Sequence, residues 1–336
     1  MPNYKDDIAS LASKLNYGEN EFVRVVSDAH KYYRPFHVIT TKNGKRKTRH
    51  IDNPHKSLPL RDLQIAIKKE LLDSQTSILD EALVGGIKKR SMMSHLEPHI
   101  GKPTVVCMDL SNCFPNISQK RVFDVWKTQL GYSNKLAELL TRATTYRGYL
   151  PQGAPTSSIL CNFALNPMAK KIHELMDANG VSYTQYIDDI CISGDDRTVR
   201  RMLSEIHHIT YSYDQKINRS KTEIMDTKHK QSAMGIVVNT RVKADSSYIK
   251  KVNKRIMEET KTGYVGSGTK LSVVGQILHI KKYDKKSGDY LERLFTKRVS
   301  DTYECIAPKK QNGEIQPCWQ YISDKTNKSK CRYLSN

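Results

Sequence analysis

Residues 183–193 read YTQYIDDICIS, two short runs rich in β-branched and aromatic residues on either side of two adjacent aspartates. Such runs are typical of strands, and an acidic pair between them is typical of a tight turn. The stretch therefore predicts a β-hairpin with Asp188 and Asp189 at its tip. A third carboxylate, Asp109, ends the apolar run VVCM at 105–108. Each of these three acids stands where a strand is expected to end.

Carboxylates crowded at strand ends repel one another unless a cation neutralises them. Oxygen-only donor sets suit Mg²⁺ or Mn²⁺. Pairs of such ions activate an attacking hydroxyl and stabilise a leaving phosphate oxygen, so the three acids are candidate metal ligands and catalytic groups. The alternative is that Asp188 and Asp189 only cap an exposed turn.

Helix and strand patterns alternate on both sides of these acids. Helices are expected at 60–72, 78–83, 117–130, 134–143, 157–176 and 198–211. Strands are expected at 104–109 and, as a pair, at 222–225 and 235–238. The order indicates a mixed helix and sheet region without internal repeats.

A second hairpin is expected near the N-terminus, with strands at 36–39 and 48–51 around Asn43 and Gly44. Five cations and no acid lie between positions 42 and 49: Lys42, Lys45, Arg46, Lys47 and Arg49. By itself this run fits a solvated turn as well as an anion-binding one.

The 336-residue chain has 55 Lys and Arg residues against 35 Asp and Glu, a net charge of +20. Such an excess favours a polyanionic partner. The seven cysteines form no C-x-x-C pair, which favours reduced thiols and a cytoplasmic location. No apolar stretch approaches the ~18–20 residues that span a bilayer, so no membrane partner is expected.

Four motifs, in order, resemble the bacterial retron-type family of reverse transcriptases, which are RNA-directed DNA polymerases. The matching segments are Val105–Asp109 with Phe114–Ile117, Leu150–Ser157 (P-Q-G-x-P-T-S), Tyr186–Asp189 (Y-x-D-D) and Ile217–Thr222 (I-N-x-x-K-T). The similarity covers about residues 33–298. Of the family's N-A-x-x-H segment only His99 is kept, and of its V-T-G triplet only Gly235. These departures leave open whether the chain belongs to the best-known retron branch or to a neighbouring defence-associated lineage.

The resemblance implies an α+β fold, a right-hand polymerase with fingers, an antiparallel palm sheet backed by helices, and a helical thumb. N-terminal helices and fingers would occupy 1–104, and the palm 105–240 with finger elements around 120–150. The thumb would occupy 241–310, where 17 basic and eight acidic residues give a net charge of +9. Residues 311–336 would form a tail of unknown role.

Site roles also follow from the resemblance. Asp109, Asp188 and Asp189 would hold two Mg²⁺ ions, with Mn²⁺ as a substitute, and Phe114 would act as a steric gate against a 2′-hydroxyl. The implied dNTP-binding residues are Lys42, Arg49, Phe114, Gln152, Gly153 and Lys221. For Lys221 a proton-donating role and a plain surface position both stay open. The expected nucleic-acid-binding residues are Lys88, Lys89, Arg90, His99, Lys250, Lys251, Lys254 and Arg255, with internal hydrogen bonding as the alternative for His99.

The implied function is that of a retron reverse transcriptase, which copies part of a structured non-coding RNA into DNA (msDNA). Synthesis would be primed from an RNA 2′-hydroxyl and would serve anti-phage defence together with an effector protein. Three alternatives remain: a bacterial reverse transcriptase outside retrons with different priming, a nucleic-acid-binding scaffold with an unused polymerase site, and an RNA-dependent RNA polymerase. The Y-x-D-D box and Phe114 discriminate against the last.

Overall fold

The computed structural model describes residues 5–42, 45–260 and 267–300. The chain divides into two compact units, residues 1–231 and 232–336. The second unit begins at Ser232, ahead of the boundary expected at residue 241, because the short strands at 232–233 and 236–237 pair with each other and with a strand at 243–244. The expected tail at 311–336 lies outside the described residues. In the part of the chain that the structure describes, no helix is long and apolar enough to cross a membrane.

The centre of the first unit is a four-stranded antiparallel sheet in the order β4-β5-β3-β6. Its strands are β3 (Thr104–Asp109), β4 (Ser182–Tyr186), β5 (Asp189–Gly194) and β6 (Glu223–Asp226). The hairpin and the strand predicted around the three aspartates are thus confirmed. The predicted pairing of 222–225 with 235–238 is wrong, because β6 supplies the second hydrogen-bonding edge of the buried strand β3.

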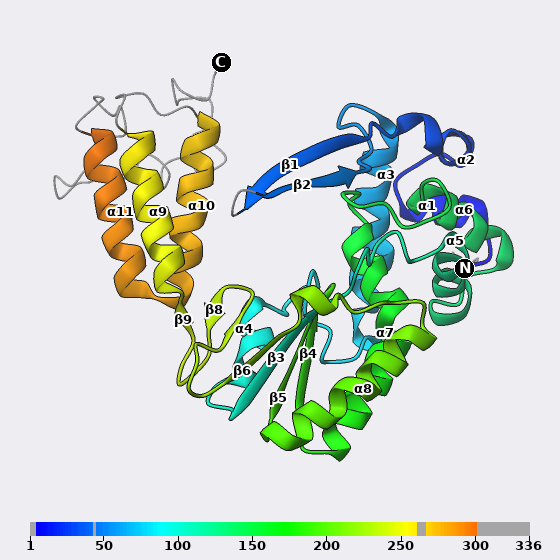
Figure 1. Cartoon of the computed structure of the whole chain (residues 1–336). Coiled ribbons are helices and arrows are strands. Elements are labelled where there is room, and N and C mark those ends of the chain that lie inside the picture. The colour runs from blue at the N-terminus through cyan, green and yellow to red at the C-terminus, as the bar shows by residue number, and fades with distance from the viewer. Residues whose placement is uncertain (1–4, 43–44, 261–266, 301–336) are drawn as a thin grey trace. The chain divides into compact units, whose positions relative to one another are not determined.

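Two long helices accompany this sheet (Figure 1). Helix α7 (Ser157–Ala178) packs on β4, and α8 (Asp196–Ser212) packs on β5 and β3. Helix α8 begins at 196 because the Asp195 carboxylate accepts a hydrogen bond from Thr198 N. Both helices confirm their predictions.

The remaining helical elements of the first unit are mostly short. They are α1 (Ile8–Lys14), α2 (Glu19–Ser27), α3 (Pro59–Ile67), α4 (Met92–Leu96), α5 (Gln119–Asp124) and α6 (Asn134–Thr144). Single turns of 3₁₀ helix lie at Ala29–Tyr32, Asp73–Ile78, Glu97–His99 and Arg219–Lys221, and π turns at Lys68–Leu72 and Val125–Gln129.

The helix predicted at 78–83 is absent, and that prediction is wrong. Carbonyl groups of this segment are bonded by the Arg90 guanidinium instead of by helical N–H groups: Leu79 O at 3.2 Å, Leu83 O at 2.6 Å, and Asp80 O. The segment ends as an extended chain, with Leu83 in a parallel bridge to Gln185. The apolar pattern at 78–83 therefore reflects burial and not helical period.

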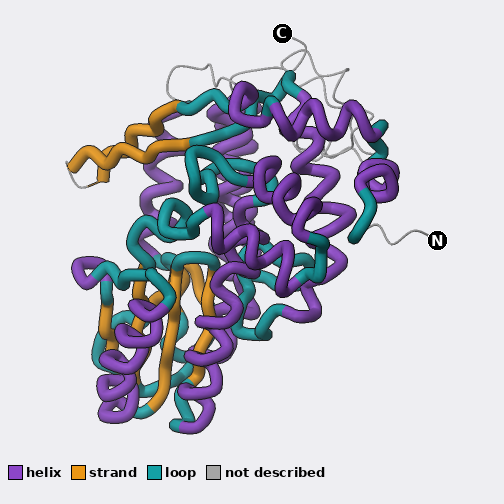
Figure 2. The backbone as a smooth tube through the Cα atoms, turned by 90° about the vertical axis from the view of Figure 1, so that its right-hand side faces the viewer, coloured by secondary structure: helices purple, strands orange, loops and turns teal. Residues whose placement is uncertain are grey.

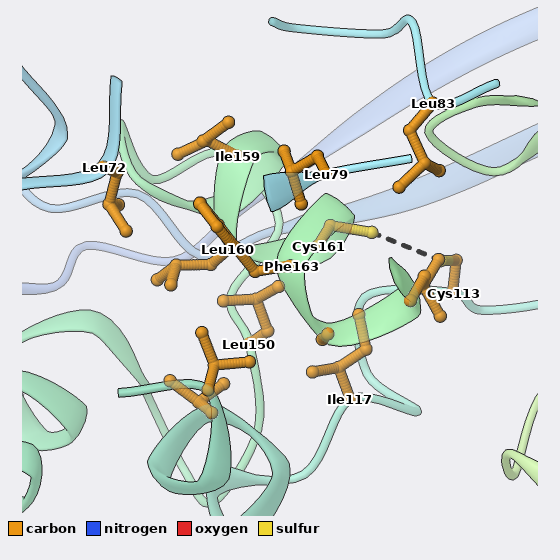
Figure 3. Packing of buried hydrophobic residues seen from close by; sticks show 14 of the residues in the cluster. Leu72, Leu79, Leu83, Cys113, Ile117, Leu150, Ile159, Leu160, Cys161 and Phe163 are labelled. Carbon is orange, nitrogen blue, oxygen red and sulfur yellow. Dashed lines mark hydrogen bonds between the residues drawn. The ribbon is translucent and has the colours of Figure 1, made fainter. Parts of the chain in front are cut away.

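One hydrophobic core joins the helices of the first unit to its sheet. Its largest fully buried side chains are Trp126, Phe22 and Phe163. In Figure 3, Leu160 and Phe163 of α7 lie among residues from distant parts of the chain. Cys161 of the same helix has its sulfur 3.6 Å from that of Cys113, and both are thiols.

The predicted N-terminal hairpin is confirmed. Strands β1 (Phe36–Lys42) and β2 (Lys45–Ile51) pair antiparallel over their whole length, from Phe36 opposite Ile51 to Lys42 opposite Lys45. In Figure 2 they form a two-stranded ribbon that projects from the helices of this unit.

The second unit combines a small sheet with three helices. The strands β7 (Ser232–Ala233), β8 (Ile236–Val237) and β9 (Lys243–Ala244) are antiparallel neighbours. Helices α9 (Ser246–Glu259), α10 (Ser267–Tyr283) and α11 (Lys285–Ser300) share a core of their own. That core includes Val252, Ile256, Val273, Ile277, Leu291 and Phe295. The expected helical character of this region is confirmed, whereas the thumb role of the unit stays a prediction.

Candidate active site

The palm-like sheet brings Asp109 and Asp189 directly opposite each other on neighbouring strands β3 and β5. Leu110 N donates to Asp188 O at 2.8 Å, so 110 and 188 form a hydrogen-bonded pair. The adjacent pair, Asp109 and Asp189, then falls at a non-hydrogen-bonded position, where cross-strand side chains approach most closely. The register therefore places two of the three predicted acids together at one end of the sheet.

Asp188 occupies the turn between β4 and β5. Ile187, the residue before it, has a φ of +60°, which is unusual for a β-branched residue. Gln185 Nε2 donates to Ile187 O at 2.7 Å and holds the turn from inside. The three carboxylates thus lie on adjacent backbone positions fixed by ladder and turn hydrogen bonds.

The acids influence one another electrostatically. Burial raises the pKa of Asp189 to about 6, and repulsion from Asp188 and Asp109 adds to the shift. Burial and repulsion from Asp109 also raise the pKa of Asp188, while the charges of Lys221 and Arg49 lower it. Both shifts mean that the ionised form of each acid is disfavoured where it lies, chiefly because the carboxyl group is buried.

Lys221 lies at this site, since its Nζ donates to Asp109 Oδ1. The lysine is placed by a short 3₁₀ turn at Arg219–Lys221 that follows a backbone bond from Asn218 N to Asp109 O of 2.7 Å. Its side chain is 42% exposed. The structure therefore brings this residue of the I-N-x-x-K-T segment to the acids, and its role in proton transfer stays a prediction.

The donor set fits a hard divalent cation, because the three clustered carboxylates offer only oxygen ligands. The pKa values of Asp188 and Asp189 are raised, so a cation that binds there would stabilise ionised forms that the chain alone disfavours. Within the described residues, however, no group of three or more His, Cys, Asp or Glu side chains is already arranged to hold a metal ion. The backbone places the acids together, and the side chains would have to converge when an ion binds.

The loop before α7 is tied to the base of the β1–β2 hairpin. Gln152 O accepts a hydrogen bond from Asp52 N at 2.9 Å. Gly153 has a φ of +113°, and a Cβ there would lie 2.8 Å from Ile51 Cγ2. Only glycine suits both this conformation and this space. These predicted dNTP-binding residues therefore have a structural reason of their own, and their contact with nucleotide stays a prediction.

A buried carboxylate at the same junction was not singled out from the sequence. Asp52 is 2% exposed and accepts from His50 Nε2 at 2.9 Å and from Tyr149 OH at 3.1 Å. It follows Ile51 at the end of β2 and stands within the R-x-I-x-x-P pattern around Arg49. Its bonds connect the hairpin to the loop at 149–153. In the sequence, the only hint of this role is that an acid directly follows a strongly basic hairpin.

For the other predicted nucleotide-binding residues, the structure gives the position in less detail. Phe114 is partly buried and packs against the core of the first unit. The charge of Arg49 acts on Asp188, which places this cation near the acids. The backbone of Lys42 ends β1, and its side chain lies outside the described part of the structure.

For the predicted nucleic-acid contacts, the structure separates exposed cations from occupied ones. Lys88 and Lys89 in the first unit, and Lys250, Lys251 and Lys254 on α9, are exposed, although Lys254 Nζ also lies 3.6 Å from Glu258 Oε1. Arg255 is half-buried and donates to Ser272 Oγ and Gln276 Oε1 on α10. Arg90 directs its donors to backbone carbonyls, as described above. Both arginines therefore support the fold.

His99 corrects the sequence prediction. It is fully buried, with ring nitrogens bonded to Ser193 Oγ at 2.7 Å and Thr184 Oγ1 at 2.8 Å. Burial lowers its pKa to about 3, so the imidazole is neutral. A nucleic acid cannot reach it in this structure. The alternative of satisfied internal hydrogen bonding is the one that the geometry supports.

An antiparallel sheet backed by helices, with two acids opposite each other at its end and a third in the adjoining turn, defines a right-hand polymerase palm. The sequence comparison agrees with this class. The model of the reverse transcriptase (RNA-dependent DNA polymerase) family matches residues 40–262, more than half of the chain. The chain belongs to this family.

Curated relatives specify the resemblance further. The chain is 29% identical over 231 residues to the retron Se72 reverse transcriptase of Salmonella heidelberg, which covers 68% of this chain and 59% of the relative. It is 28% identical over 204 residues to the retron Ec86 reverse transcriptase of Escherichia coli, covering 60% and 62% respectively. The matched part thus spans about three fifths of these relatives. The predicted resemblance to retron-type enzymes is confirmed.

A solved structure of telomerase from Candida albicans with a fragment of telomeric RNA is also similar. The match has 14% identity and a TM-score of 0.45, and covers 82% of this chain and 62% of that one.

Proposed function

We propose that this chain is the RNA-directed DNA polymerase of a bacterial retron. It would copy part of a structured non-coding RNA into msDNA. The observation that carries the proposal is the placement of Asp109 opposite Asp189, with Asp188 in the adjoining turn and Lys221 bonded to Asp109. Family membership and the named retron relatives support it.

In this proposal the three aspartates would hold two Mg²⁺ ions, or Mn²⁺ in their place. Bound cations of this type neutralise phosphate charge and lower the pKa of an attacking hydroxyl. The chain's own contribution is positioning: the β3–β5 register fixes two carboxylates, and the turn fixes the third. Lys221 would release Asp109 and donate a proton to the leaving pyrophosphate; its bond to Asp109 supports this role.

Selection of the nucleotide would rest on residues around the acids. Arg49 and Lys42 would grip the triphosphate with the β1–β2 hairpin. Phe114, five residues after Asp109, would pack under the sugar and exclude a 2′-hydroxyl. Gln152 and Gly153 would border the template and the incoming sugar.

The RNA partner is inferred from charge. The chain's net charge of +20 suits a polyanion, and A-form RNA is gripped through its phosphates and 2′-hydroxyls. Exposed lysines of α9 would contact this backbone. Priming from an RNA 2′-hydroxyl, an effector protein and a role in anti-phage defence complete the proposal by analogy with retrons.

A primed RNA template provides the decisive assay. Purified protein with Mg²⁺ should extend it with dNTPs at least about 100-fold faster than with NTPs, because the steric gate discriminates between sugars. Equal use of NTPs would exclude a DNA polymerase. Sequencing of co-purified nucleic acid after debranching distinguishes a retron from the main alternative, a reverse transcriptase with other priming, since only the former yields a branched RNA–DNA species.

A further inference from the structure

The turn that carries Asp188 is held in a conformation that its sequence disfavours. Ile187 has a φ of +60°, and a β-branched side chain meets its own backbone there. Such a conformation persists only where the surroundings over-determine it. The neighbours of this turn should therefore contribute to the position of the acid.

Gly85, which is far away in the sequence, lies directly against this turn. A Cβ at this position would lie 2.7 Å from Ile187 Cγ1, 2.8 Å from Ile187 N and 3.0 Å from Tyr186 C. Two of these three atoms belong to the backbone and cannot rotate away. Any side chain at position 85 would therefore displace the turn.

The segment that contains this glycine, residues 82–85, is itself held firmly. Val84 N donates to Gln185 O at 2.9 Å, and Gln185 N donates to Ala82 O at 2.7 Å, so the segment pairs with β4. Asn162 Nδ2 of α7, a fully buried amide, donates to Gly85 O at 2.7 Å. The Arg90 guanidinium donates a further hydrogen bond to Leu83 O. The glycine thus has little freedom to retreat from the turn.

We propose that residues 82–85 form a buttress for the catalytic turn, with Gly85 and Asn162 as positioning residues for Asp188. The buttress does not touch substrate. It sets where the turn backbone lies, and Gln185 completes it by bonding both the segment and Ile187 O. This inference rests on the proposed polymerase function.

The variant Gly85→Ala tests the buttress by adding one methyl group. We expect kcat for DNA synthesis to fall about 10–100-fold, since a displacement of about 1 Å at a catalytic group has effects of this size. The KM for dNTP should stay within threefold, because the triphosphate contacts are elsewhere. Gly18→Ala is the matched control: no atom lies within 4 Å of a Cβ there. Wild-type kcat in Gly85→Ala would overturn the proposal.

A second variant distinguishes positioning from general loss of packing. Ile187→Gly removes Cγ1 and permits positive φ without strain. In this background the added methyl group still meets Ile187 N and Tyr186 C, so Gly85→Ala should still reduce kcat, but less than in the wild type, because the contact with Cγ1 is gone and a glycine lets the turn shift without strain. A larger reduction in this background than in the wild type would contradict the proposed contact. Asn162→Leu keeps the volume but removes the bond to Gly85 O, and should lower kcat in the same direction.

Binding of Mn²⁺, followed by electron paramagnetic resonance of the free ion, gives a readout without turnover. Gly85→Ala should weaken the Mn²⁺ site that Asp188→Asn abolishes, by about tenfold, whereas Gly18→Ala should not. Unchanged affinity would overturn the buttress. If the wild type binds Mn²⁺ but makes no DNA, the proposed function fails while this arm still decides whether Gly85 positions Asp188.

Discussion

Two antiparallel hairpins of the first unit differ in how they hold functional groups. The β4–β5 hairpin is buried in the sheet, and its turn is packed against Gly85 and bonded by Gln185. The β1–β2 hairpin is exposed along its strands: Phe36, Val38 and Ile39 are 47%, 37% and 59% exposed. Its attachment is at the base, through Asp52 and the loop at 149–153.

This difference in exposure fits the charged groups of the two hairpins, which are acids in the β4–β5 turn and cations in the β1–β2 hairpin. Acids that act on a reacting atom need fixed positions, since small displacements cost much of the rate. Cations that attract a triphosphate act through a field that falls slowly with distance, so an exposed ribbon can carry them. The comparison implies that changes in the buried hairpin should affect kcat, and changes in the exposed one should affect KM.

The largest expected effect comes from the buried hairpin. Replacing both acids, Asp188→Asn with Asp189→Asn, should reduce DNA synthesis by at least about 10³-fold, because the charge that binds the cations is lost. RNA affinity, measured by filter binding, should stay within threefold of wild type. Synthesis at more than a few per cent of the wild-type rate would refute the assignment of these acids.

In the exposed hairpin, Arg49→Ala should raise the KM for dNTP about tenfold or more and change kcat less, since a charge-assisted contact to phosphate is removed. The matched control is Arg46→Ala. Residue 46 lies on the opposite face of β2, because side chains alternate along a strand. Steady-state kinetics at varied dNTP concentration measures both constants. Equal effects of the two variants would mean that the hairpin acts only through its net charge.

Exposed cations of the second unit extend the same reasoning to RNA. Changing Lys250, Lys251 and Lys254 to Gln should weaken RNA binding several-fold at low salt and reduce the slope of log affinity against log salt by up to about one unit per lost phosphate contact. Arg255→Gln, which removes bonds to α10, should instead lower the melting temperature. An unchanged slope in the triple variant would place the RNA elsewhere.

The smallest expected effect concerns stability. Since the pKa of Asp189 is raised to about 6 in the folded chain, its ionisation is less favourable there than in the unfolded chain. Well below pH 4, Asp189 is protonated in both the folded and the unfolded chain. The contribution of Asp189 to stability should therefore fall as the pH rises from about 4 to 6, and the stability difference between wild type and Asp189→Asn should change over this range.

Without divalent ions, Asp189→Asn should raise the melting temperature by about 2–6 °C at pH 7.5 and leave it unchanged near pH 4. Differential scanning calorimetry at both values tests this prediction. If the melting temperature of Asp189→Asn at pH 7.5 is no higher than that of wild type, ionisation of Asp189 does not destabilise the folded chain.

Local pattern was sufficient for the elements that carry the acids. Short runs rich in apolar, β-branched and aromatic residues, with a polar turn between two of them, predicted β4, β5 and β3, because this composition is a property of the strand itself. The family resemblance of the motifs then implied that Asp109 would meet Asp188 and Asp189. The register that brings them together joins two strands far apart in sequence, and the pattern within each strand does not encode it.

Elements that depend on distant partners could not be predicted in this way. The apolar pattern at 78–83 predicts a helix, but the backbone carbonyl groups of this segment accept hydrogen bonds from the Arg90 side chain instead. His99 was expected to contact nucleic acid, although Thr184 and Ser193 bury it. The pairing of β6 with β3 and the role of Asp52 likewise follow from segments far apart in sequence, which no periodicity encodes.

The ion pair between Lys221 and Asp109 has a consequence for any assay of metal affinity. A lysine ammonium already neutralises one carboxylate of this site before an ion arrives. If Asp109 holds Mg²⁺ as proposed, the ion would have to replace the Lys221 ammonium there, so that binding would exchange one cation for another. Lys221→Gln should accordingly tighten the apparent binding of the first ion, even if it slows the chemistry that follows.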